Sequence, residues 1–147
     1  MFSGCTSLTT LPSNLLPATT LANSCYSRMF SGCTRLTTLP NLPATTLADM
    51  CYSNMFRGCT RLVEIPEGWY LPAQTINSYS CSYMFADCYS LQKMAVSYSG
   101  TINSSDWQDF LTDVYPTGTF YYSKNQTEEN IRSIVPSGWT LVQSKVW

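Results

Sequence analysis

The sequence predicts an α/β solenoid in which each repeat contributes one short parallel strand and one helix. The word MFSGCTSLTTLP at Met1 returns in variant form at Met29, Met55 and Met84, at intervals of 28, 26 and 29 residues. A second word, LPATTLANSCYSR, connects the copies and also recurs. Self-similarity at this period indicates stacked supersecondary units, because one copy is too small to bury its own apolar face. We number the repeats 1 to 4 from these methionines.

Each repeat is expected to hold a strand, a turn and a helix. In repeat 2, Leu36 and Leu39 lie in a threonine-rich extended segment that Pro40 ends, because proline cannot continue a strand ladder. The word TLAD at 46–49 then fits a capping box. Apolar residues follow at spacings of three and four, which predicts a helix of about ten residues that ends near Gly58.

The chain divides into a repeat region and a closing segment. Residues 1–95 hold about three and a half leucine-rich units, and the period is lost from Val96 onwards. Residues 96–147 are expected to form an α+β cap over the end of the core. Within this cap the sequence predicts a helix over 106–114 that begins with a capping box, strands over 119–123 and 140–146, and a helix over 127–134.

Composition narrows the range of functions. The net charge is −1 and only 12% of residues are charged, so the basic patch typical of nucleic-acid binding is absent. The sequence has no histidine, the commonest general base and transition-metal ligand. No motif offers a serine nucleophile a replacement base. We therefore expect a protein that is not an enzyme, with no catalytic residues, no metal and no cofactor.

Targeting signals are also missing from the sequence. No apolar run approaches the length of a membrane-spanning helix, and no signal peptide precedes the repeats. Met1 coincides with the methionine that opens every repeat. We therefore expect the chain to be a C-terminal fragment of a longer protein.

Cysteine and phenylalanine occupy fixed positions in the repeat. Cysteines within one repeat lie seven or eight residues apart, about 12 Å along a helix and too far for a disulfide. We favour buried, unpaired thiols, with disulfides between repeats or a metal site as alternatives. The phenylalanines are expected to form one buried column. The residues concerned are Cys5, Cys33, Cys59 and Cys88, Cys25, Cys51 and Cys81, and Phe2, Phe30, Phe56 and Phe85.

The pattern F-x-G-C-x-x-L-x-x-L-P, with LPATTLA and CYSxMF between its copies, resembles the BspA-like subclass of leucine-rich repeats. The words GTFYYSKN and VPSGWT resemble the segment that often ends such arrays. The resemblance implies a leucine-rich-repeat solenoid from a cell-surface or secreted protein of the gut Bacteroidetes type. It also implies adhesion or host-protein binding. The chain departs from the pattern after Val63, where Glu-Ile replaces Thr-Leu and Gly68-Trp69-Tyr70 is inserted.

Equivalent strand residues are expected to form one row along the stack, the usual binding surface of a repeat protein. The leading hypothesis is a non-catalytic interaction module that adheres to a host or neighbouring-cell protein or glycan. A structural spacer in a surface protein and a receptor-binding part of a phage fibre are the alternatives. Oligomeric state and ligand identity stay open, and a tyrosine ladder is a second candidate surface. The candidate binding residues are Thr9, Thr10, Thr37, Thr38, Glu64, Gln92 and Lys93.

Overall fold

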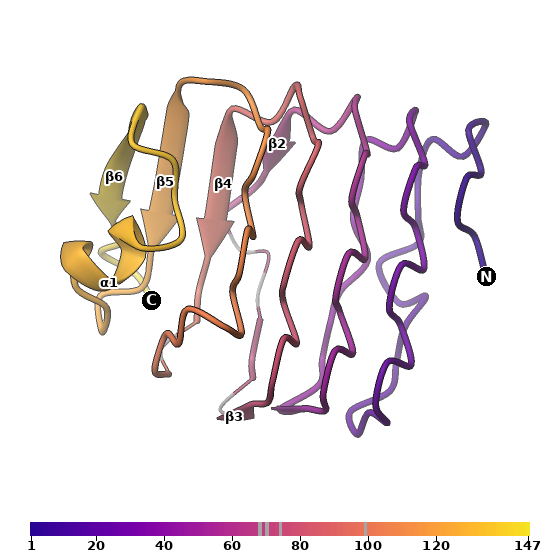
Figure 1. The fold of residues 1–147 in the computed structure, drawn as a ribbon, viewed down its shortest axis with the longest axis horizontal. Coiled ribbons are helices and arrows are strands. Elements are labelled where there is room, and N and C mark those ends of the chain that lie inside the picture. The colour runs from indigo at the N-terminus through magenta and orange to yellow at the C-terminus, as the bar shows by residue number, and fades with distance from the viewer. Residues whose placement is uncertain (68, 70, 74, 99) are drawn as a thin grey trace.

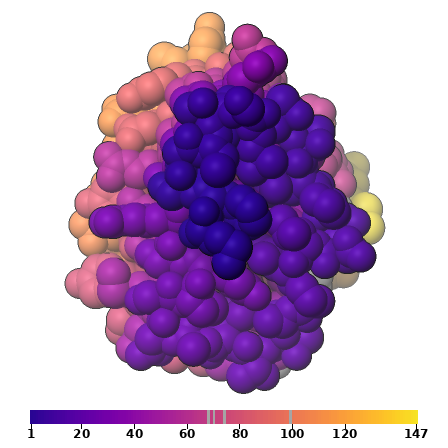
Figure 2. Space-filling model, turned by 90° about the vertical axis from the view of Figure 1, so that its right-hand side faces the viewer, coloured from indigo at the N-terminus to yellow at the C-terminus, as the bar shows by residue number. Residues whose placement is uncertain are grey.

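The computed structural model describes residues 1–67, 69, 71–73, 75–98 and 100–147, so Gly68 and Tyr70 of the insertion lie outside the described residues. Successive repeats lie side by side as coils, running from the N-terminus at one end of the molecule to β6 and α1 at the other (Figure 1). The first residues lie across the end of this row (Figure 2), where Phe2 is only partly buried. In the part of the chain that is described, no helix has the length and apolar character needed to cross a membrane.

The strands are short and parallel. One sheet pairs β1 (Thr46–Leu47) with β3 (Thr75–Ile76), and an isolated bridge joins Thr20 to Thr46. The other sheet has the order β2-β4-β5-β6. Its strands are β2 (Glu64–Ile65), β4 (Lys93–Val96), β5 (Gly118–Tyr122) and β6 (Trp139–Gln143). The sheet lies along one side of the row of coils (Figure 1).

The predicted fold class, a leucine-rich-repeat solenoid with one helix per repeat, is wrong. Among the described residues the sole α-helix is α1 (Glu128–Arg132), and it lies in the C-terminal segment. The LTTLP words of repeats 1 and 2 are not strands either, so no continuous sheet runs through the repeats. Consecutive turns replace the expected helices, over 23–32 and 49–58 for example. We call this side of the coils the turn side, and the opposite side, with the LTTLP words and β2, β4, β5 and β6, the strand side.

The hydrogen bonding of the turn side explains why no helix forms. Within one coil the N–H of Met55 donates to the carbonyl of Tyr52 (3.1 Å), whereas the N–H of Phe56 donates to the next coil, at Met84 (2.9 Å). This alternation recurs along the segment, so half of its N–H groups join neighbouring coils. Every fourth residue has a positive φ, for example 56° at Asn54 and 72° at Gly58. An α-helix excludes both features, because it needs negative φ and i→i−4 bonds throughout.

The apolar spacing misled the prediction because a period of four resembles the helical period over a short segment. Cys51, Met55 and Cys59 recur at intervals of four, as do Tyr52 and Phe56, and all five are buried. Over eight residues a helix of period 3.6 drifts from this pattern by only about 80°. The left-handed positions carried a better signal, because glycine and asparagine adopt positive φ more readily than most residues.

The predicted phenylalanine column is confirmed. Phe2, Phe30, Phe56 and Phe85 stack with ring centroids 5.6, 5.6 and 5.4 Å apart, and all but Phe2 are fully buried. Phe110 continues the column edge-on, with its ring centroid 5.5 Å from that of Phe85. Each repeat therefore buries its aromatic ring only by stacking against its neighbours.

The cysteines form a second column beside the rings. All seven are free; five are buried, and Cys5 and Cys25 are exposed. The expectation of buried thiols is therefore correct for five of them. The Sγ of Cys59 donates to the carbonyl of Phe30 (3.4 Å), and that of Cys88 to the carbonyl of Phe56 (3.3 Å). Burial raises the pKa of Cys88 to about 12, so its thiol stays protonated.

Stacking continues past the point where the sequence period is lost. The helix expected over 106–114 is wrong: this segment is a further set of turns, with positive φ at Asp109 and Asp113. It accepts hydrogen bonds from the preceding coil, including Phe85 N–H to the Phe110 carbonyl (3.1 Å). The other expected elements occur as β5, β6 and the shorter α1, whose first turn is capped by Thr127. The division at residue 96 stays a prediction.

Candidate functional site

The seven predicted binding residues all lie on the strand side, and all but Lys93 are exposed. Glu64 of β2 is in register with Lys93 of β4, which is in register with Thr119 of β5. The Lys93 ammonium lies over the ring of Tyr121, 5.5 Å from its centroid. The predicted row therefore exists as a surface, although its first part is not a sheet.

Repeats 1 and 2 are joined on this side through threonine side chains. The N–H and Oγ1 of Thr37 both donate to the carbonyl of Thr9, at 2.9 and 3.0 Å. The Oγ1 of Thr38 accepts the N–H of Leu11 at 2.9 Å. Thr37 and Thr38 therefore bind repeat 2 to repeat 1, and both hydroxyls are engaged in that join.

Repeats 2 and 3 lack this join. Val63 and Glu64 stand where repeat 2 has Thr37 and Thr38, so the two linking hydroxyls are missing. Among the described residues, no hydrogen bond connects 37–39 to 63–65. The strand β2 instead pairs with β4, and the carbonyl of Val63 accepts the N–H of Gln92 at 2.9 Å. Within the described part of the chain, the other edge of β2 has no partner strand.

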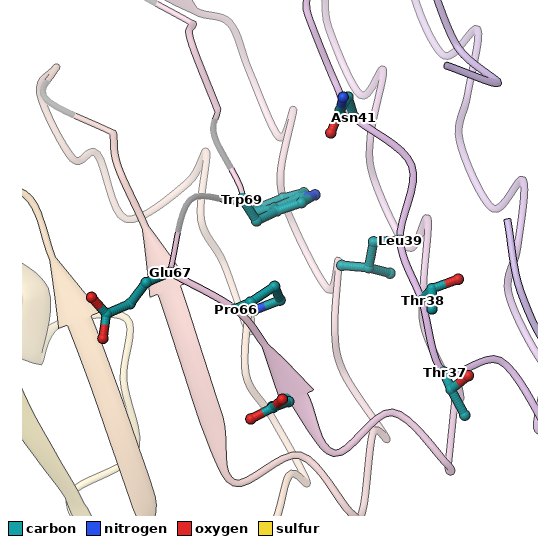
Figure 3. Close-up of a pocket in the computed structure, with 8 residues that line it drawn as sticks. Thr37, Thr38, Leu39, Asn41, Pro66, Glu67 and Trp69 are labelled. Carbon is teal, nitrogen blue, oxygen red and sulfur yellow. The ribbon is translucent and has the colours of Figure 1, made fainter. Parts of the chain in front are cut away.

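A groove of about 460 Å³ opens at this break. In Figure 3 the side chain of Leu39 points across it towards Pro66 and Trp69, and the Glu67 carboxylate points away from Leu39. One wall comes from repeat 2 and the other from repeat 3. The lining residues are Thr37, Thr38, Leu39 and Asn41 on the first wall, and Glu64, Pro66, Glu67 and Trp69 on the second.

Trp69 closes the inner part of the groove. Its indole N–H donates to the carbonyl of Pro40 at 3.2 Å, and its ring packs edge-on against Phe85 at 6.1 Å. The side chain is only 6% exposed. An inserted residue therefore spans the space between repeats 2 and 3 where the threonine bonds are absent.

The groove is acidic. Glu64 and Glu67 are exposed, and neither belongs to an ion pair among the described residues. Asn41 adds an exposed amide, while its backbone N–H is bound to the carbonyl of Ser13 (2.8 Å). The described residues contain no cluster of three or more potential metal ligands. Two carboxylates, an amide and an apolar wall suit binding of a polar or cationic group.

The structure brings together only part of the predicted site. Thr37, Thr38 and Glu64 line the groove, whereas Thr9 and Thr10 lie beyond the first join and Gln92 and Lys93 beyond β2. The departure from the repeat after Val63, and the insertion that contains Trp69, were the signals that marked this place. Sequence reasoning missed five lining residues: Leu39, Asn41, Pro66, Glu67 and Trp69.

The tyrosine ladder is mostly structural. Tyr52 is fully buried and stacks on Tyr26 with centroids 6.3 Å apart. Burial raises the pKa of Tyr52 above its ordinary value. Tyr79 is 45% exposed but lies on the turn side, away from the groove.

Comparison with known proteins adds no relative: no protein-family model, curated protein or solved structure matches this chain. The resemblance of its repeat words to a known class therefore stays an expectation.

Proposed function

We propose that the chain is a non-catalytic interaction module that binds a partner protein or glycan at the groove between repeats 2 and 3. The observation that carries the proposal is the break in the stack, where exposed polar side chains and a strand edge surround a preformed space. Preformed sites bind with a smaller entropic cost than sites that must be ordered first. The hydrogen-bonded turn side supplies the rigid frame.

Several features favour binding over catalysis. The chain has no histidine, and the described residues that line the groove include no nucleophile beside a base. The two carboxylates are exposed, whereas catalytic carboxylates commonly have an environment that shifts their pKa values apart. A surface rich in Thr, Ser, Asn and Tyr suits a module on a cell surface or in a secreted protein, with a host or neighbouring cell as the source of its partner.

One observation favours the alternative of a structural spacer. The turn side joins coil to coil through backbone hydrogen bonds, from Gly4 donating to Ser31 as far as Asp87 donating to Thr112. Such a row holds its two ends at a fixed separation without any ligand. A spacer requires no groove, so the groove separates the two proposals.

The deciding experiment uses the whole chain on an array of glycans and extracellular-matrix proteins. Asn41→Trp places a large uncharged side chain at the groove, and Asn130→Trp on α1 is the matched control because both asparagines are exposed. We expect at least one ligand, with affinity reduced at least about tenfold by the first variant alone. Equal loss in both variants, or no ligand at all, would support the spacer.

A further inference from the structure

We infer that the ligand of this groove is an extended basic segment of a partner protein, which pairs with the free edge of β2 and places Lys or Arg beside Glu64 and Glu67. The inference rests on the proposed binding function and specifies its ligand. Three observations carry it: the direction of the peptide groups of β2, the carboxylates at its edge, and the burial of the aromatic side chain that lines the groove.

The first observation is the orientation of the strand edge. The carbonyl of Val63 faces β4, where it accepts N–H groups of Gln92 (2.9 Å) and Lys93 (3.4 Å). Peptide groups of successive residues in a strand point to opposite sides. The N–H and C=O of Glu64 therefore point away from β4, towards the groove. An edge of this kind is a template for another strand.

The second observation is charge. Glu64 and Glu67 are exposed at this edge, without a cationic partner among the described side chains. The nearest cation in register is Lys93, which lies over the Tyr121 ring. Charged residues on an edge discourage random pairing. A carboxylate does so for neutral and acidic strands, but it attracts a basic one and thereby selects it.

The third observation argues against a sugar as the principal ligand. A sugar ring would use an exposed aromatic face, and among the described residues Trp69 is the only aromatic one that lines the groove. Its ring is 6% exposed, and its N–H already donates to Pro40. Backbone pairing and ion pairs, which a basic strand supplies, remain available at β2.

The test measures binding of three peptide probes to the whole chain by isothermal titration calorimetry. The probes are the basic peptide acetyl-KTKTKTKT-amide, its acidic counterpart acetyl-ETETETET-amide, and the basic peptide with alternate amides N-methylated. We expect binding of the basic peptide, none of the acidic one, and at least about a tenfold loss on N-methylation, which removes backbone donors but keeps the charge.

The variants assign the binding to this edge. Glu64→Gln with Glu67→Gln should weaken the basic peptide about three- to tenfold, the range of two exposed ion pairs. Glu128→Gln with Glu129→Gln makes the same charge change on α1 and should alter affinity less than about twofold. All four glutamates are exposed, so these variants should stay folded.

The outcomes separate this inference from the function on which it rests. If an array ligand depends on Asn41 but the basic peptide does not bind, or a glycan occupies the groove, the inference fails and the binding module stands. If the N-methylated peptide binds as well as the parent, attraction is by charge alone and the strand-pairing inference is overturned. If neither the array nor the peptide shows binding, both proposals fail.

Discussion

The two sides of the molecule join their coils by different means. On the turn side the joins are made by the backbone, as where Phe30 N–H meets Met55 C=O and Phe85 N–H meets Phe110 C=O. On the strand side repeats 1 and 2 are joined partly by threonine hydroxyls. Backbone joins survive a change of sequence, and the turn side continues after the repeat pattern is lost. Side-chain joins do not, and a change at two positions opens the groove.

This difference suggests how a repeat protein acquires a site without losing its frame. Val63 and Glu64 remove two hydroxyls from the strand side, while the turn side of the same repeats keeps its hydrogen bonds, such as Tyr52 to Ser80 (3.0 Å). The opening is therefore local. The following predictions test this contrast, beginning with the largest effect.

The largest effect is expected where the coils share their core. Phe56 lies between Phe30 and Phe85, at centroid distances of 5.6 and 5.4 Å, and is fully buried. Phe56→Ala should lower the free energy of unfolding by about 3–5 kcal/mol, measured by urea denaturation. Phe2→Ala, at the partly exposed end of the column, is the control and should cost clearly less. A loss below about 1 kcal/mol for Phe56→Ala would show that the column does not stabilise the stack.

Alkaline pH should weaken the turn side through its buried thiols. Burial raises the pKa of Cys51 and Cys88 from 9.0 to about 12. The unfolded chain therefore loses these protons first, so stability is complete below pH 9 and is lost as pH rises from 9 to 12. Tyr52 acts in the same direction at still higher pH, because its pKa is also raised by burial.

The measurement is the free energy of unfolding in reductant at several pH values. It should be flat below pH 9 and fall above it, and Cys51→Ala should make the fall shallower. In native protein at neutral pH a thiol reagent should modify Cys5 and Cys25 rapidly, since only these two cysteines are exposed. Rapid modification of all seven thiols, or stability independent of pH up to 12, would contradict the buried column.

The sequence predicted stacking and the aromatic column because Phe30, Phe56 and Phe85 keep their phase in every copy. It predicted a helix instead of turns because periods of four and 3.6 cannot be separated over two turns. The turns depend on hydrogen bonds to a neighbouring coil, and no local pattern reports such bonds. The segment 106–114 was misread for the same reason.

The site was predictable only in part. Thr37, Thr38 and Glu64 were expected on one exposed face, as equivalent positions of neighbouring repeats. Their sequence did not show that the two threonines serve as links. The role of Trp69 depends on the carbonyl of Pro40 in another repeat, a contact that only the fold creates.

A smaller effect is expected at the left-handed positions of the turn side. Gly58 has a φ of 72°, and an added Cβ would meet only ordinary contacts, the nearest at 3.7 Å from Gly32. Gly58→Ala should therefore cost about 1–2 kcal/mol through backbone strain alone. Arg61→Ala, exposed and outside the positive-φ positions, is the control with an expected change near zero. An equal stability of both variants would mean that the left-handed turn is not required.

The smallest effect concerns the break itself, and it compares two amide protons. The N–H of Glu64 faces the groove without a partner among the described residues, whereas the N–H of Thr119 donates to the carbonyl of Gln92 at 2.9 Å. In wild-type protein the Glu64 amide should exchange with deuterium much faster than the Thr119 amide, because exchange is slowed by hydrogen bonding. Equal protection of the two amides would show that the break is closed in solution.

Restoring the threonines should remove that difference. Val63→Thr with Glu64→Thr gives repeat 3 the two residues with which Thr37 and Thr38 link repeat 2 to repeat 1, and Pro66 corresponds to Pro40 in the same register. We expect a gain of about 0.5–1.5 kcal/mol per hydrogen bond formed, slower exchange of the backbone amide at position 64, and no change at Thr119. The matched change Thr37→Val with Thr38→Val should open the first join and cost a similar amount. If the restored hydroxyls leave exchange at position 64 fast, then the inserted Trp69, and not the missing hydroxyls, holds the groove open, because its indole spans the two repeats through the carbonyl of Pro40.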